Sequence, residues 1–139
     1  MIWAHPITLE EINRRCRNTL CDHLGIEFVE IGDNHMTATM PVDRRTHQPL
    51  GTVHGGATAA LAETVGSIAA NACVPKGKVC LGLDLNINHI RTVSSGFVRA
   101  IARPLHLGKT TQVWEIKIVN EAEQLISAAR LTIAVLAKD

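Results

Sequence analysis

The stretch from Ala57 to Cys73 constrains the fold most, because it is long, consists mainly of Ala, Leu, Val and Ile, and directly follows Gly55 and Gly56. Small and helix-forming apolar residues over this length favour a buried helix rather than a strand. Such a helix would be roughly 25 to 30 Å long, at about 1.5 Å per residue. That length is enough to form the centre of a small domain.

One row of polar side chains interrupts this apolar helix. Glu63, Ser67 and Asn71 follow one another at intervals of four residues, so they share one helical face. A carboxylate in so apolar a helix must be paired, must lose its charge or must face a wet cleft. The two preceding glycines stand where backbone N–H groups lack partners and the helix dipole is positive. The sequence therefore predicts an oxyanion or phosphate site at the helix start and a carboxylate about two turns further on.

The remaining chain predicts shorter elements on both sides of this helix. A capping box of Thr8 and Glu11 starts a helix over residues 9–20. A hairpin over 24–31 and 36–40 follows, with its turn at 32–35, and a polar loop over 43–51 leads to the central helix. Four strands come after it, at 79–88, 97–107, 110–119 and 125–136. The alternation of the first stops at His89, where we expect a bulge or the strand end, and Pro104 indicates an edge or a bend in the second.

These elements predict one α+β domain over residues 1–139, in which a curled antiparallel sheet wraps one apolar helix. Three or four of the strands after the helix are expected to form an antiparallel meander. The chain is long enough to bury a substantial core.

Composition argues against several classes of function. With 14 basic and 13 acidic side chains, the formal charge of +1 gives no general attraction to nucleic acid, and only four aromatic residues are available to stack on bases. The seven histidines lack metal-ligand spacing, so no metal site is predicted. The N-terminus does not resemble a secretory signal and no stretch reaches membrane-spanning length. Four cysteines without a C-x-x-C motif are expected to be reduced thiols of a cytoplasmic protein.

Several motifs surround the central helix. They are Met1-Ile2-Trp3, Met40-Pro41-Val42-Asp43, Arg45-Thr46-His47-Gln48-Pro49, His54-Gly55-Gly56 with Ala62-Glu63, Gly82-Leu83 with Asn86, Asn88, His89 and Arg91, and Pro104-Leu105-His106-Leu107-Gly108. This combination resembles the hotdog-fold acyl-CoA thioesterases, in the group of the enterobactin-pathway proofreading thioesterase and the 1,4-dihydroxy-2-naphthoyl-CoA hydrolase, which is related to 4-hydroxybenzoyl-CoA thioesterase. The resemblance covers nearly the whole chain and implies the hotdog fold. Leu50 departs from it, because these relatives usually carry Phe there, and this leaves the acyl group open.

The resemblance implies hydrolysis of an aryl- or acyl-CoA thioester, or of an acyl carrier protein thioester, to a free acid and a thiol. Glu63 would be the nucleophile or the general base, and the residues do not decide between these two roles. The Gly55 N–H and the Gln48 side chain would polarise the carbonyl. His54 would orient the substrate, and Ser67 would orient water or the carboxylate.

The resemblance also implies contacts with coenzyme A, which is part of the substrate, so no separate cofactor is expected. The residues concerned are Gly82, His89, Ile90, Arg91, Thr92, His106, Leu107, Gly108, Lys109, Thr110 and Thr111. Arg91 can pair with a phosphate. The turn at Gly108 and Lys109 offers backbone N–H groups and a cation.

A single sheet around one helix leaves a long open edge and an exposed apolar face. The resemblance implies a homotetramer, a dimer of dimers, with Gln48 and Gly55 of one subunit facing Glu63 of another. Two other functions stay open on the same fold. A non-catalytic acyl-CoA-binding domain would have no need of a buried carboxylate, and a dehydratase would need an acid/base pair, for which Asp84 and His89 are the only nearby residues.

Overall fold

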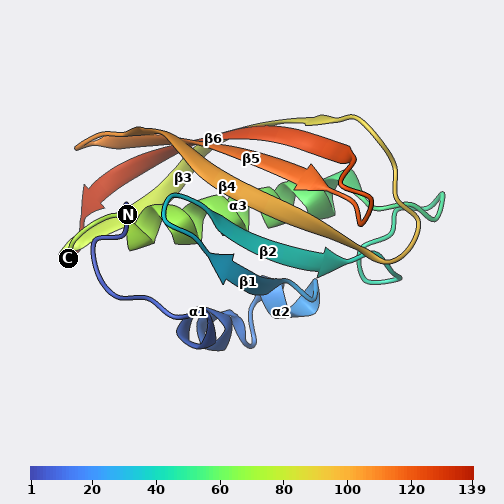
Figure 1. The fold of residues 1–139 in the computed structure, drawn as a ribbon, viewed down its shortest axis with the longest axis horizontal. Coiled ribbons are helices and arrows are strands. Elements are labelled where there is room, and N and C mark those ends of the chain that lie inside the picture. The colour runs from blue at the N-terminus through green and yellow to red at the C-terminus, as the bar shows by residue number, and fades with distance from the viewer.

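The computed structural model describes residues 1–139 and confirms the α+β architecture. The elements in chain order are α1 Leu9–Cys16, α2 Leu20–His23, β1 Glu27–Ile31, β2 Met36–Pro41, α3 Gly55–Ala72, β3 Lys78–His89, β4 Phe97–Leu107, β5 Thr111–Val119 and β6 Leu125–Ala137. The six strands form one antiparallel sheet that curves over α3, while α1 and α2 lie beside β1 at one side of the sheet (Figure 1). None of the three helices combines the length and hydropathy needed to span a bilayer.

The core lies between α3 and the concave face of the sheet. Glu63 is the one charged residue of α3, and Leu61 and Val65 are among its fully buried side chains. Leu61 and Val65 belong to one hydrophobic cluster with Trp114 and Leu131 of the sheet. Burying an aliphatic side chain of this size contributes about 1.5–3 kcal/mol. Packing against the sheet therefore holds α3 in place, as its apolar sequence predicts.

The strand order confirms a meander of three strands rather than four. The order is β1-β2-β4-β5-β6-β3, so β4, β5 and β6 are sequential neighbours but β3 pairs with β6 at the edge of the sheet. Pro104 was expected at an edge or a bend. The pairing of β2 with β4 ends at Ala102, so no strand lies beside Pro104 on that side, and the pairing with β5 is irregular between Pro104 and His106. The alternation of polar and apolar residues indicates which face of the sheet each side chain lies on. It does not indicate which strands are neighbours in the sheet.

Strand β3 contains an irregularity that its alternating sequence hides. Its pairing with β6 shifts between Gly82 and Asp84, and Leu81 and Leu83 are exposed although Cys80 is buried. A bulge inserts one residue and so exchanges the two faces of a strand. The strand end at His89 is confirmed.

The predicted helix over residues 9–20 is shorter than expected, because α1 ends at Cys16 and the separate α2 starts at Leu20. Asn18 between them has φ of 61°. This left-handed conformation breaks a helix and is tolerated by Asn better than by most residues.

The two edge strands are each bonded by an asparagine from a helix. Asn13 of α1 accepts from Phe28 N at 2.8 Å and donates to Phe28 O at 3.0 Å. Asn71 of α3 makes the same pair of bonds to Cys80 N and O, at 2.8 and 3.0 Å. Beyond Cys80, no strand or side chain bonds the outer edge of β3. The fold therefore protects the β1 edge with α1 and leaves most of the β3 edge open.

Replacing Asn71 by Ala removes both bonds to the Cys80 backbone and should lower the free energy of unfolding by about 2 kcal/mol. Urea unfolding at one fixed protein concentration measures this change. Asn34→Ala is the matched control, because this exposed turn residue has no side-chain hydrogen bond, and it should change stability by less than about 0.5 kcal/mol. Equal effects of the two variants would contradict a structural role for Asn71.

Candidate active site

The start of α3 leaves one backbone donor free. His54 is the N-cap residue, and its Nδ1 accepts the Gly56 N–H at 2.7 Å. The His54 carbonyl oxygen accepts from the N–H groups of Ala57 and Thr58, at 2.9 and 3.2 Å. The N–H of Gly55 has no partner in the chain. The positive end of the helix dipole therefore presents a single unused N–H, which suits an oxyanion.

A histidine occupies the space beside Gly55. The His89 Nε2 atom lies 2.8 Å from the position that a Cβ of residue 55 would take. On the other side of the ring, Ser127 Oγ lies 3.1 Å from Nδ1 and Thr58 Oγ1 lies 3.4 Å from the same atom. The missing Cβ thus admits the imidazole of His89. Sequence reasoning missed Thr58 and Ser127, because a single hydroxyl in an apolar helix or strand is a weak signal.

The Glu63 carboxylate is half-buried and has no cationic partner. None of the five ion pairs of the chain includes it, so the structure does not support the alternative of a paired carboxylate. Ser67 Oγ donates to Glu63 Oε2 at 3.2 Å. Gly82 of β3 lies against the same oxygen, which fills the place of a Cβ at residue 82. The two neighbours hold the carboxylate along the seam between α3 and β3.

The Gln48 side chain is anchored within its own loop. Its Nε2 donates to Thr52 Oγ1 at 2.6 Å, and its Oε1 accepts from the Leu50 N–H. The second N–H of Nε2 has no partner in the chain. The Leu50 side chain beside Gln48 is 88% exposed, so it lines no cavity within one chain.

Gly55 and Glu63 lie on the same helix but too far apart to serve one carbonyl group. They are eight residues apart in α3, which corresponds to about 12 Å along the axis. A hydrogen bond spans only about 3 Å. One chain thus holds the free N–H and the carboxylate at two separate places.

The residues expected to contact coenzyme A fall into two groups at opposite ends of α3. The segment after β3 lies near the helix start, where the N–H groups of Ile90 and Arg91 donate to Ile126 O, at 2.8 and 3.2 Å. The β4–β5 hairpin lies near the helix end, where Gly108 and Lys109 line a cavity of about 340 Å³ that also includes Cys73 and Lys78. Within one chain, the structure does not bring these groups together.

One donor expected at that hairpin is not available. The Gly108 N–H closes the turn by donating to Thr111 O at 2.8 Å, so of the two N–H groups of this turn only that of Lys109 is without a partner in the chain. Thr110 O is likewise occupied, because it accepts from Val135 N. Arg91 and Lys109 are exposed and form no ion pair, so their charges remain free for an anion.

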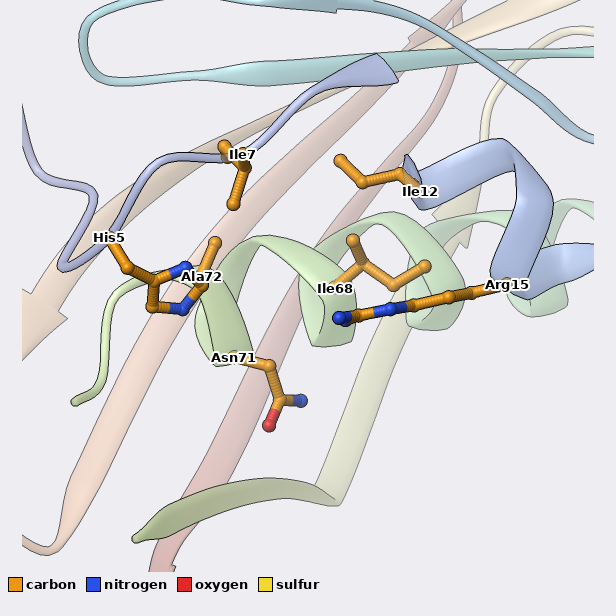
Figure 2. A pocket seen from close by; sticks show the side chains of 7 residues that line it. All are labelled: His5, Ile7, Ile12, Arg15, Ile68, Asn71 and Ala72. Atoms are coloured by element: carbon orange, nitrogen blue, oxygen red, sulfur yellow. The ribbon is translucent and has the colours of Figure 1, made fainter. Parts of the chain in front are cut away.

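A small cavity lies beside the polar face of α3. It has a volume of about 200 Å³ and lies between the N-terminal segment, α1 and α3. The side chains of Ile7, Ile12 and Ile68 line it, and the Arg15 side chain extends past Ile68 (Figure 2). Ile68 directly follows Ser67, so this apolar space begins next to the residue that contacts the carboxylate.

The structure does not support a cysteine nucleophile or the acid/base pair of a dehydratase. Burial raises the pKa of the Cys16 and Cys73 thiols to about 12, so neither is a thiolate nucleophile at neutral pH. All four cysteines are free, as expected. No hydrogen bond joins Asp84 to His89, whose Nδ1 lies within hydrogen-bond distance of Ser127, so the acid/base pair of a dehydratase is not formed.

Comparison with known proteins identifies the family. A model of the thioesterase superfamily matches residues 50–127, which is more than half of the chain. The chain is 48% identical over 136 residues to the proofreading thioesterase EntH of Cronobacter turicensis, covering 98% of this chain and 99% of that protein. It superimposes with a TM-score of 0.97 on a thioesterase from Haemophilus influenzae, at 48% identity over 99% of this chain and 96% of the other.

A mutant thioesterase from Pseudomonas aeruginosa gives the same TM-score of 0.97, at 44% identity over 99% of this chain and all of the other. The predicted hotdog fold and the predicted class of enzyme, a thioester hydrolase, are both confirmed. The chain belongs to the thioesterase superfamily.

Proposed function

We propose that this thioester hydrolase acts on aryl- or acyl-CoA thioesters, with Glu63 as the reacting carboxylate and the Gly55 N–H as the donor to the carbonyl oxygen. The observation that carries the proposal is the half-buried Glu63 carboxylate, which no cation neutralises and which Ser67 and Gly82 hold in place. A domain that only binds acyl-CoA has no need to leave such a carboxylate unpaired.

Two routes use this geometry. In one, Glu63 attacks the carbonyl carbon, the C–S bond breaks, coenzyme A leaves as the thiolate, and water then hydrolyses the mixed anhydride. In the other, Glu63 takes a proton from water while the oxygen of that water attacks the carbonyl carbon, and the C–S bond then breaks so that coenzyme A leaves and takes up the proton as the free thiol. Both routes place negative charge on the carbonyl oxygen. The free Gly55 N–H stabilises this charge, and one such donor typically changes kcat by about 10²–10³-fold.

We infer that the complete site forms between two copies of the chain, as the family resemblance implies. The separation of Gly55 and Glu63 along α3 supports this, because no single carbonyl reaches both in one chain. Two residues of β3 contact the two half-sites on α3: Gly82 contacts Glu63, and His89 contacts Gly55. Antiparallel pairing of two open β3 edges about an axis near Asn86 would place Gly82 of one copy opposite His89 of the other, and so bring the two half-sites together.

The same assembly accounts for the other expected residues. The two groups of coenzyme A contacts lie at opposite ends of α3 in one chain, so they can serve one coenzyme A molecule if they come from different copies. Arg91 and Lys109 would then supply cations for its phosphates. Pairing two such dimers would give the homotetramer that the resemblance implies.

One N–H of the Gln48 amide donates to Thr52. The second N–H of the same group remains for the thioester carbonyl oxygen, as the resemblance implies. His54 keeps its Nδ1 on the helix cap, which leaves its exposed Nε2 to orient the substrate. The cavity lined by Ile68 (Figure 2) offers space for the apolar part of the acyl group. The free cysteines fit a reducing compartment such as the cytoplasm.

Thiol release from benzoyl-CoA, a hydroxylated benzoyl-CoA, a hydroxynaphthoyl-CoA and a medium-chain acyl-CoA tests the proposed function. The wild type should hydrolyse at least one aryl-CoA, and Glu63→Ala should lower kcat by at least about a hundredfold, because the reacting carboxylate is gone. Glu10→Ala is the control, since this exposed carboxylate lies on α1 and makes no side-chain bond. Binding of every thioester without turnover by the wild type would replace the enzyme with a binding domain.

Subunit exchange tests the shared site. Glu63→Ala and Gly55→Val protomers are each expected to be inactive alone. After mixing, half of the pairs carry one intact site, so activity should return to about a quarter of the wild-type value for a two-fold dimer. Exchange is verified with differently tagged protomers. Verified exchange without any recovered activity would show that each chain contains its own complete site.

Gly82→Ala separates two roles of this glycine. A Cβ there collides with Glu63 Oε2, so displacement of the carboxylate should lower kcat by about 10–100-fold, as a misplaced catalytic group does, while KM changes little. If Gly82 serves mainly as a contact for coenzyme A, KM rises instead and kcat is retained. Steady-state kinetics on the best substrate of the panel distinguishes these results.

A further inference from the structure

We propose that His89 is a catalytic residue, which donates a hydrogen bond from Nε2 to the carbonyl oxygen of the thioester bound at Gly55. This role differs from the coenzyme A contact that the family resemblance implies for His89. The inference rests on the proposed function, because it takes the free Gly55 N–H as the place where the carbonyl oxygen binds.

The hydrogen bonds behind the ring determine which nitrogen carries the proton. Ser127 on β6 is fully buried, and His89 Nδ1, at 3.1 Å, is the only partner of its side chain. Thr58 Oγ1 donates its proton to the Gly55 carbonyl oxygen at 3.0 Å, so it supplies none to the ring. A buried O–H group needs an acceptor for its proton, and an unprotonated Nδ1 is the only one within hydrogen-bond distance of Ser127, so we assign this bond as donated by Ser127. The proton of the neutral imidazole then stands on Nε2.

The protonated nitrogen is also the ring atom closest to Gly55. Nε2 is 2.8 Å from the Cβ position of residue 55, whereas the two neighbouring ring carbons are 3.2 and 3.3 Å away. No group of the chain accepts a hydrogen bond from Nε2. Two donors without acceptors, the Gly55 N–H and the His89 Nε2–H, thus lie beside one another at the helix start.

The Gln48 amide is anchored in its own loop by Thr52 and Leu50, and no contact of the structure places its second N–H beside Gly55. His89, in contrast, is held by Ser127 and by its packing on Gly55 before any substrate binds. Donors that are already oriented toward a developing charge are the most effective, since no reorganisation is needed during the reaction. His89 is therefore better placed than Gln48 to act, together with the Gly55 N–H, as a preoriented donor to the carbonyl oxygen.

His89→Phe tests the proposal, because it keeps an aromatic ring against Gly55 and removes the donor. It should lower kcat by about 10–100-fold, as the loss of one oxyanion donor does, with KM changed less than about threefold. His89→Gln, which retains an N–H donor, should recover part of this loss. His23→Phe is the matched control, since His23 is exposed at the end of α2 and its side chain forms no hydrogen bond.

Infrared spectroscopy reads the hydrogen bond directly. A ketone analogue, with CH₂ in place of the thioester sulfur and ¹³C in the carbonyl group, is bound to each variant. Its carbonyl stretch should move toward the free frequency in His89→Phe and stay at the wild-type frequency in His23→Phe. If His89→Phe does not fold, His89→Gln and Ser127→Ala carry the test, and Ser127→Ala should give a smaller shift in the same direction because the imidazole loses its fixed tautomer.

Two results would overturn the proposal. A rise in KM with unchanged kcat would make His89 a coenzyme A contact, and a loss of kcat with an unchanged carbonyl stretch would make it a packing residue. The spectroscopic measurement does not require turnover. If the wild type hydrolyses no thioester, the proposed function fails, while the carbonyl stretch still decides whether His89 donates to a bound carbonyl group.

Discussion

The close contact between α3 and β3 is the constraint on which the candidate site depends. A helix and an edge strand approach each other here at two positions where the chain has no Cβ. At Gly82 the missing side chain leaves room for the Glu63 carboxylate, and at Gly55 it leaves room for the His89 imidazole. Each glycine is thus matched with an ionisable side chain from the other element, and a larger residue at either position would displace that side chain.

The position of Glu63 explains why α3 needs so much apolar packing elsewhere. An unpaired carboxylate on a half-buried helical face costs desolvation energy that no ion pair returns. The other faces of α3 carry fully buried residues such as Leu61 and Val65, which pack under Trp114 and Leu131. The sheet therefore stabilises the helix on one side, while the opposite side keeps a charge that can react.

The two edge strands of the sheet differ in how far a helix covers them. Asn13 and the body of α1 close the β1 edge, whereas Asn71 bonds β3 only at Cys80. The open part of β3 runs from Gly82 to His89, which are the two residues beside the separated halves of the site. An edge that is left unpaired is suited to pairing with a second copy, because this contact buries its free backbone groups, and under the proposed function it would also join the two half-sites.

The sequence alone determined the central helix, the free donor at its start and the polar row of Glu63, Ser67 and Asn71, because helical periodicity links residues that are near in the chain. The bounds of β4 at Phe97–Leu107 also follow from local alternation. The tertiary structure decided which strand lies beside which, and so placed β3 next to β6. It also decided that the bulge between Gly82 and Asp84 puts Leu81 and Leu83 on the exposed face while Leu85 and Ile87 pack against the core, and that Ser127 and Thr58 meet at His89. These contacts join residues that are distant in the chain, and no local pattern specifies them because register and strand order depend on the packing of the whole sheet.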